Sequence, residues 1–305
     1  MVLVVGSFMT DLVVRTNITP TKGQTVIGNS FNIFLGGKGA NQAVASKRMG
    51  AKTMMVGALG DDTFGQNFKD FFKKEGFDEN HILIKETSSG IGQIVINEQT
   101  GDNQIIIIPG ANLHFDVNDL LDFESLFKDV KIVVNQLEMT DAVIFETKRL
   151  AKKHHKLYLL NPAPFKKLPD EFLKDIDFLT PNETELEGFV GNPLKTLEDY
   201  KSGAQALVEK GVKNVIVTLG EKGALHCDKD GCKHYPPFEK EVVDTVAAGD
   251  AFNGTFASMI ALGKSIDEAI VYANGAGAVT VTRHGAIPSI PTFTEVESFI
   301  KKQTK

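Results

Sequence analysis

The chain has 305 residues, a formal net charge of -6 and 42% hydrophobic residues. This length and apolar content suffice for one large α/β domain or two smaller ones, and they exclude a disordered chain. Acidic and basic residues are interspersed, which argues against nucleic-acid and anionic-membrane surfaces, because both require a concentrated basic face. We therefore expect a small molecule as the partner.

The first nine residues, "MVLVVGSFM", are apolar, and Asp11 follows almost at once. They lack a basic leader and a small-residue cleavage site, which indicates a buried strand and not a signal peptide. No stretch elsewhere is long enough to span a bilayer. The sequence contains only two cysteines, so we expect a cytoplasmic, reducing location and no disulfide framework.

A glycine-rich segment, "FLGGKGANQAVASKRMG" over residues 34–50, precedes a helix that we expect over residues 38–49. Glycine-rich turns before helices offer unpaired backbone N–H groups, and anions are their usual ligands. A Walker loop, however, needs four residues between its first glycine and Gly-Lys, and then Ser or Thr. Lys38 is followed instead by Gly39 and Ala40, so the segment alone leaves phosphate binding open.

Short apolar runs alternate with helical patterns through most of the remaining sequence. This alternation predicts an α/β fold with a doubly wound, mainly parallel sheet covered on both faces. In such sheets ligands bind at the carboxyl ends of the strands. Several expected strands end there in polar residues, namely Asp11, Glu138, Asn161, Asn182 and Thr218.

Two segments, residues 12–35 and 88–110, show β-type alternation without an intervening helix. We interpret them as a small β-sheet lid beside a core made of residues 1–11, 36–87 and 111–305. Apolar residues alternate in the lid, for example Ile94, Ile96, Ile105 and Ile107, and exposed sheet edges of this kind are usually covered. The lid is therefore also expected to be a dimer clasp.

The two cysteines lie in "LHCDKDGCKHY", residues 225–235. His226, Cys227, Cys232 and His234 could be imagined as zinc ligands. A hairpin is favoured, because "DKDG" is a turn signal between alternating segments and a zinc knuckle normally has cysteines two to four residues apart.

The strongest chemical signal is "DTVAAGDAFNGTFASMIALG", residues 244–263. Its apolar stripe predicts a helix that stops at Gly263. Small residues before Asp250 leave the N–H groups of the first turn uncovered, which suits a phosphate whose charge grows during transfer. Asp250 at this positive helix end is favoured as a general base over a simple helix cap, which Ser or Thr would also provide.

These segments resemble a known family. "GGKGANQAVA" and "DTVAAGDAFNG" are similar to the two signatures of the PfkB carbohydrate kinases, and within that family the ribokinase group is most similar. "LNPAP", "TPNETE", "TLGEKG" and "VTRHGAIPS" match ribokinase segments in the same order. The resemblance covers nearly the whole chain.

The resemblance implies transfer of a phosphoryl group from ATP to the 5-hydroxyl of D-ribose, directly and in line, in a homodimer joined through the lid. Asp250 would take the hydroxyl proton, and the backbone N–H groups of residues 247–250 would form the anion hole; these catalytic positions are Ala247, Ala248, Gly249 and Asp250. The sugar would contact Asp11, Gly37, Lys38, Asn41, Gly92, Ile94, Glu138 and Asp250.

By the same resemblance, the nucleotide would contact Asn182, Thr218, Gly220, Gly223, Gly249 and Asn274. Glu185 would act on Mg²⁺ through its water shell. A potassium ion beside the anion hole would activate the enzyme, held by the side chains of Asp244 and Ser289 and the carbonyls of Val246, Thr280, Arg283 and Gly285. Ligands that are all oxygen suit a hard cation.

One position departs from the pattern. Met9 stands where bacterial ribokinases usually have asparagine, and methionine cannot make the hydrogen bond of that amide to a sugar hydroxyl. D-ribose remains the expected substrate. The alternatives are another PfkB kinase acting on fructose, a deoxyribose or a nucleoside, and a non-catalytic ribose sensor, against which the intact "AAGD" argues.

Overall fold

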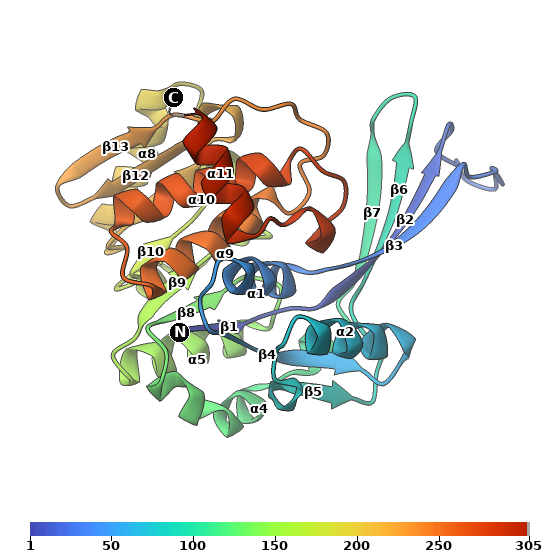
Figure 1. The fold of residues 1–305 in the computed structure, drawn as a ribbon, viewed down its shortest axis with the longest axis horizontal. Coiled ribbons are helices and arrows are strands. Elements are labelled where there is room, and N and C mark those ends of the chain that lie inside the picture. Colours follow the sequence, from blue (N-terminus) through green and yellow to red (C-terminus); the bar gives the residue numbers. More distant parts are fainter. Residues whose placement is uncertain (304–305) are drawn as a thin grey trace.

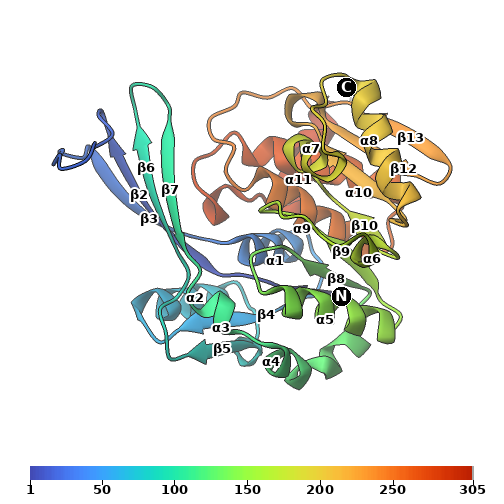
Figure 2. The same cartoon turned by 180° about the vertical axis from the view of Figure 1, so that it is seen from behind.

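The computed structural model describes residues 1–303, which form a large sheet between two helical layers and a smaller sheet that projects from one side (Figures 1 and 2). Within these residues the large sheet has nine strands in the order β13-β12-β11-β10-β9-β8-β1-β4-β5. Pairs from β11 to β5 are parallel, and β12 and β13 add an antiparallel edge. The predicted doubly wound, mainly parallel α/β fold is confirmed. The strands are β1 Val2–Val5, β4 Thr53–Gly60, β5 Ile82–Lys85, β8 Ile132–Asn135, β9 Leu157–Leu160, β10 Phe178–Leu179, β11 Val215–Thr218, β12 Ala224–Asp228 and β13 Gly231–Tyr235.

The central strand β1 shows why this sheet must be covered on both faces. All four of its side chains are fully buried, as is typical of parallel strands between two layers. Val2 and Val4 pack into one apolar cluster, whereas Leu3 and Val5 pack into another on the opposite face. Because successive side chains of a strand point to opposite faces of the sheet, β1 contributes to two separate apolar cores.

Helices cover both faces of the sheet. The layer of α1, α9, α10 and α11 lies on one face, and α5 and α8 belong to the other (Figures 1 and 2). Several begin at side-chain caps, for example Asp62, Thr140, Thr196 and Ser265, which satisfy N–H groups of the first turn. The helices are α1 Lys38–Arg48, α2 Thr63–Lys74, α3 Ala111–His114, α4 Val117–Asp122, α5 Asp141–Lys153, α6 Asp170–Leu173, α7 Glu183–Val190, α8 Leu197–Glu209, α9 Ala248–Ala261, α10 Ile266–Thr280 and α11 Phe293–Gln303.

The strand order reverses at β1, which pairs with β4 on one side and β8 on the other. Ligands of open α/β sheets bind at such a point, beyond the carboxyl ends of the strands. Polar residues stand at the carboxyl ends of these strands: Ser7 after β1, Glu138 after β8, Asn161 after β9, Asn182 after β10, and Thr218 as the last residue of β11. The fold thus gathers most of the polar strand ends predicted from the sequence at one edge.

The smaller sheet, here called the lid, contains four strands within the described residues, in the order β3-β2-β6-β7. It stands beside the core in both views (Figures 1 and 2). Asp11 of β2 faces Gly92 of β6 in the register. Several apolar lid side chains are exposed, including Phe31, Ile33 and Ile105. The lid strands are β2 Met9–Thr16, β3 Ser30–Gly36, β6 Ile91–Asn97 and β7 Asn103–Ile108.

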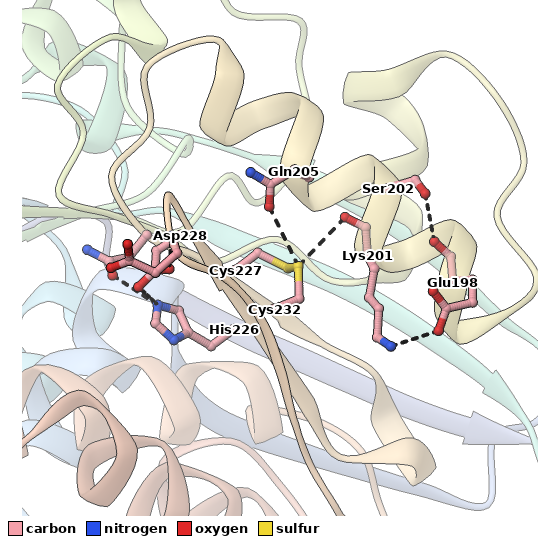
Figure 3. Close-up of a disulfide and its surroundings, with 10 residues drawn as sticks. Glu198, Lys201, Ser202, Gln205, His226, Cys227, Asp228 and Cys232 are labelled. Atoms are coloured by element: carbon pink, nitrogen blue, oxygen red, sulfur yellow. Dashed lines mark hydrogen bonds and ion pairs between the residues drawn. A yellow bond between two sulfur atoms is a disulfide. The ribbon is translucent and has the colours of Figure 1, made fainter.

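The predicted hairpin at the sheet edge is present as β12 and β13, in which Cys227 and Cys232 face each other. The two form a disulfide beside α8 (Figure 3), a pairing that the sequence analysis did not expect. Directly opposed positions of an antiparallel pair bring two Cβ atoms within reach of each other. The bridge joins cysteines five positions apart, across a turn that the hairpin already closes, so it does not act as a framework for the fold.

The four residues considered as zinc ligands, His226, Cys227, Cys232 and His234, have other partners in the structure. His226 Nε2 lies 2.9 Å from the Asn214 side-chain oxygen, and His234 Nε2 lies 2.7 Å from the Lys222 carbonyl oxygen. Within residues 1–303 no group of three or more His, Cys, Asp and Glu side chains has a metal-binding arrangement. In the same part of the chain, no helix combines the length and apolar character needed to cross a membrane.

Candidate active site

Helix α1 starts very close to the turn between β1 and β2. A Cβ atom at Gly39 would lie 2.4 Å from the Ser7 backbone nitrogen, closer than any side chain tolerates. Glu138 reinforces this approach, because one carboxylate oxygen accepts hydrogen bonds from the Ser7 hydroxyl and, at 3.0 Å, from the Lys38 backbone N–H. The glycines of "GGKG" therefore permit backbone packing here.

Ala247 is the N-cap of helix α9, and its φ of 60° lies in the left-handed region. Such a conformation is rare for a residue other than glycine and costs about 1 kcal/mol or more. The Ala248 N–H donates a long bond of 3.3 Å to the Thr245 carbonyl, so one group of the predicted anion hole has a partner. Gly249 and Asp250 stand in the first turn, where no helical acceptor precedes them.

The helices α1 and α9 cross in contact at Gly254. A Cβ atom at this position would lie 2.3 Å from the Gln42 carbonyl oxygen and 2.6 Å from Ala45 Cβ. Only glycine permits two helix backbones to come this close. The crossing places the first turn of α1 beside the first turn of α9.

Asp250 is buried at this crossing and is held by two amides of α1. Asn41 Nδ2 donates to one carboxylate oxygen at 2.8 Å, and Gln42 Nε2 donates to the other at 2.9 Å. Asn41 Oδ1 is also buried, and within the described chain it accepts no hydrogen bond. A buried acceptor without a partner is costly, and its position beside a carboxylate suits a ligand hydroxyl.

The electrostatics of the site centre on Lys38. Burial alone would lower its pKa, but Asp250, Glu138, Glu185 and Asp11 outweigh burial and raise the pKa of Lys38. Burial, followed by repulsion from Glu138 and Asp250, raises the pKa of Asp11 to about 7. Burial likewise raises the pKa of Glu138 and of Glu185. One ammonium group thus stands among four carboxyl groups.

The predicted sugar residues gather around Asp250 from three elements. Asn41 contacts it directly, and Asp11 and Glu138 act on Lys38 from the lid strand and from the segment after β8. A Cβ atom at Gly92 would lie 2.6 Å from an Asp11 carboxylate oxygen. Gly37 is the N-cap of α1, whereas Ile94 stands further along β6, opposite Val13.

A cleft of about 550 Å³ lies at the start of α9, where Ala248, Gly249 and Phe252 line it. A cavity of this size is typical of small-molecule sites. Its apolar lining includes Phe238, Val242 and Val281, which were not predicted. All six predicted nucleotide residues line it, namely Asn182, Thr218, Gly220, Gly223, Gly249 and Asn274.

Asp250 lines a smaller chamber of about 210 Å³. Gly249 and Thr218 line both spaces. Lys38, Glu185 and Asp250 line the chamber and not the cleft. Glu185 is partly engaged, since its carboxylate accepts the Asn182 N–H at 2.9 Å in a capping box.

The predicted potassium residues lie on two loops that are bonded to each other. Asp244 accepts the Val246 N–H at 3.0 Å and the Gly285 N–H at 3.1 Å. Thr280 ends α10, and its carbonyl accepts the Arg283 N–H at 3.1 Å. The Ser289 hydroxyl donates to the Ala286 carbonyl at 2.7 Å. These oxygens fit a hard monovalent cation, which they would hold beside the start of α9.

Sequence reasoning missed several polar residues of the site. Gln42 follows the predicted Asn41 directly, and Asn161 was noted only as a strand end. Asn253 Nδ2 donates to the Gly249 carbonyl at 2.8 Å, and its side-chain oxygen accepts the Thr180 hydroxyl at 2.5 Å. Polar side chains inside a buried helix such as α9 are the signal that could have identified Asn253.

Comparison with known proteins agrees with this geometry. Residues 1–293 match the model of the pfkB family carbohydrate kinases. The deoxyribokinase of Salmonella typhi is 36% identical over 98% of both chains, and the ribokinase of Schizosaccharomyces pombe is 37% identical over 99% of both. The ribokinase of Arabidopsis thaliana, solved with ribose and ATP, superposes with a TM-score of 0.92 and 30% identity over 98% of each chain. The chain therefore belongs to the pfkB family of carbohydrate kinases.

Proposed function

We propose that this protein is an ATP-dependent sugar kinase that phosphorylates the 5-hydroxyl of D-ribose. One observation carries the proposal. Asp250 is buried between the amides of Asn41 and Gln42 and a chamber that shares lining residues with the 550 Å³ cleft. A hydroxyl bound at Asn41 and a phosphoryl group entering from the cleft would meet at this carboxylate. The relatives named ribokinase support ribose as the sugar.

In the proposed reaction the oxygen of the sugar hydroxyl attacks the γ-phosphorus of ATP while Asp250 accepts the hydroxyl proton. The bond between the γ-phosphorus and the oxygen that leaves with ADP breaks. The N–H groups at the start of α9 and the Lys38 ammonium stabilise the charge on the transferred group. Lys38 therefore has two proposed tasks, because its backbone is tied to Glu138 of the sugar side and its side chain lines the chamber.

Two metal ions complete the proposal. Mg²⁺ would be held with ATP, with Glu185 acting through bound water, and it would supply charge neutralisation of the phosphates. The loop oxygens of Asp244, Val246, Thr280, Arg283, Gly285 and Ser289 would hold K⁺. The bonds from Asp244 fix the loop that leads into Ala247, so cation binding there would order the anion hole.

A specific observation supports 2-deoxyribose as the second candidate substrate. Met9 is buried in the sugar side, with its sulfur 3.4 Å from Asn112 Nδ2. A thioether has no hydrogen-bond donor for a sugar hydroxyl, so a sugar that lacks this hydroxyl loses no hydrogen bond to Met9. The relative named deoxyribokinase is as similar to the chain as those named ribokinase.

The testing experiment is a sugar panel with ATP, Mg²⁺ and either K⁺ or Na⁺, assayed by ADP release. We expect ribose to have the highest kcat/KM, 2-deoxyribose the next, and K⁺ to raise turnover. Asp250→Asn should lower kcat by ~10²-fold or more, because it removes the general base. If Asp250→Asn keeps more than about a tenth of the turnover, the base assignment fails. Ribose binding without turnover would point to a sensor.

Dimerisation through the lid and a cytoplasmic location belong to the same proposal, in which Cys227 and Cys232 would be held as thiols by the reducing compartment. The lid exposes a run of apolar side chains from Ile105 to Ile108 on β7, along with Phe31 on β3. These residues lie on the two edge strands of the lid, and exposed apolar edges of this kind are usually covered. A second copy of the chain, related by a twofold axis, would cover them. A monomer at micromolar concentration in light scattering would exclude this arrangement.

A further inference from the structure

We infer that Gln42 is a positioning residue that holds Asp250 ready to act as the base. Gln42 is fully buried next to the predicted sugar residue Asn41. Its side chain points across the helix crossing and donates to Asp250 Oδ1 at 2.9 Å. The inference rests on the proposed role of Asp250.

The orientation of the Gln42 amide follows from a chain of hydrogen bonds that ends at a backbone group. The Thr180 carbonyl can only accept, so Asn161 Nδ2 donates to it at 3.2 Å. Asn161 therefore turns its oxygen to Gln42 Nε2, at 3.0 Å. From the other side, Gln136 Nε2 donates to Gln42 Oε1 at 2.8 Å. The two N–H groups of the Gln42 side-chain amide are then directed to two oxygen acceptors, Asn161 Oδ1 and Asp250 Oδ1.

Two neutral amide donors suit a catalytic base better than a salt bridge to Asp250 would. Asn41 and Gln42 each donate to a different oxygen of Asp250, so the carboxylate cannot rotate freely about its last bond. Both donors are neutral. They fix the group and still leave lone pairs for the hydroxyl proton, whereas a cation bonded directly to Asp250 would reduce its proton affinity more strongly.

The proposal predicts that Gln42 acts through Asp250 and through nothing else. Gln42→Met keeps the length of the side chain and removes both of its N–H donors. We expect kcat to fall tenfold to about a hundredfold, because a bond to a charged group is lost and the carboxylate is misplaced. The KM values for sugar and ATP should change by less than about threefold, since Gln42 itself lines neither the 550 Å³ cleft nor the 210 Å³ chamber.

The deciding measurement is a double-mutant cycle of Gln42→Met and Asp250→Asn, with ribose kinase turnover as the readout. In the Asp250→Asn background, Gln42→Met should change the residual turnover by less than about twofold. Gln136→Met, which removes the support of the amide, should lower kcat less than Gln42→Met and also lose its effect in that background. Calorimetric titration with ribose and with ADP verifies that the binding sites of each variant are intact.

A matched control is Asn135→Leu, which also removes a buried amide next to the same network. Asn135 bonds to the Val5 carbonyl and to the Tyr158 hydroxyl, and its loss should lower stability while turnover stays within about twofold. An equal effect of Gln42→Met in both backgrounds, or no effect in the wild type, would overturn the inference. High turnover of Asp250→Asn would instead refute the proposed base, so the two failures are distinguishable.

Discussion

Gly254→Ala should damage both stability and catalysis, because it separates the two helices that build the site. The added methyl group would lie 2.3 Å from the Gln42 carbonyl oxygen, whereas ordinary contacts begin at 3.4 Å, so the helices must part by about 1 Å. Overpacking of this kind costs about 3 kcal/mol at the upper end, and the helix propensity of alanine returns about 1 kcal/mol. The net loss of about 2 kcal/mol corresponds to a fall in Tm of about 3 °C for a chain of this length.

The same shift moves Asn41 and Gln42 away from Asp250, and a misplacement of about 1 Å can cost a hundredfold in rate. The assay is ribose kinase turnover combined with thermal unfolding. Gly203→Ala is the control, because Gly203 also lies inside a helix but its nearest neighbours are leucine methyl groups at 3.2 Å and 3.4 Å that can rotate away. An unchanged kcat and Tm in Gly254→Ala would refute the argument that this contact sets the site.

Two further predictions concern stability. The pKa of Asp11, raised to about 7 mainly by burial, means that the folded state binds its proton more tightly than the unfolded state, so stability is lost as pH rises toward 7. Asp11→Asn should therefore stabilise the ligand-free protein at pH 8, by at most about 4 kcal/mol, but not at pH 4, while raising the KM for sugar; an equal effect on Tm at both pH values would contradict this. Arg48 donates to the carbonyls of Ile287 and Ile290 and pairs with Glu75 at 2.7 Å, so Arg48→Met should lower the free energy of unfolding by about 2 to 3 kcal/mol. The exposed pair of Arg149 with Glu146 provides the control, because Arg149→Met should cost less than about 1 kcal/mol, and equal losses in urea titration would count against the reasoning.

The fold class was predictable because its signals are local. Alternating apolar runs and helical stripes specify which residues must be buried on each element, and a parallel sheet is the arrangement that buries them all. The hairpin at residues 224–235 was predictable from its turn residues. Its disulfide was not expected, because a chain with only two cysteines has no disulfide framework. The bridge depends instead on the strand register, which places Cys227 opposite Cys232.

The candidate site was predictable only in part, because its key contacts are not local. Asn41 and Asp250 carried motif signals, but the bonds from Gln42 to Asp250 and to Asn161 join residues 208 and 119 positions apart. Neighbouring helix residues point about 100° apart, so sequence alone does not show that Asn41 and Gln42 reach the same carboxylate. That outcome depends on the close crossing at Gly254.

The crossing of α1 and α9 also bears on how the protein is made. The apolar face of α1, with Ala40, Ala43 and Val44, is buried in the same cluster as Phe256 of α9. During synthesis this face has no α9 to cover it until about residue 261 has emerged from the ribosome. Contacts between such distant segments form slowly and leave apolar surface exposed meanwhile. The nascent chain therefore exposes the apolar face of α1 until α9 has been synthesised, and this face is a surface on which aggregation can begin and chaperones can act.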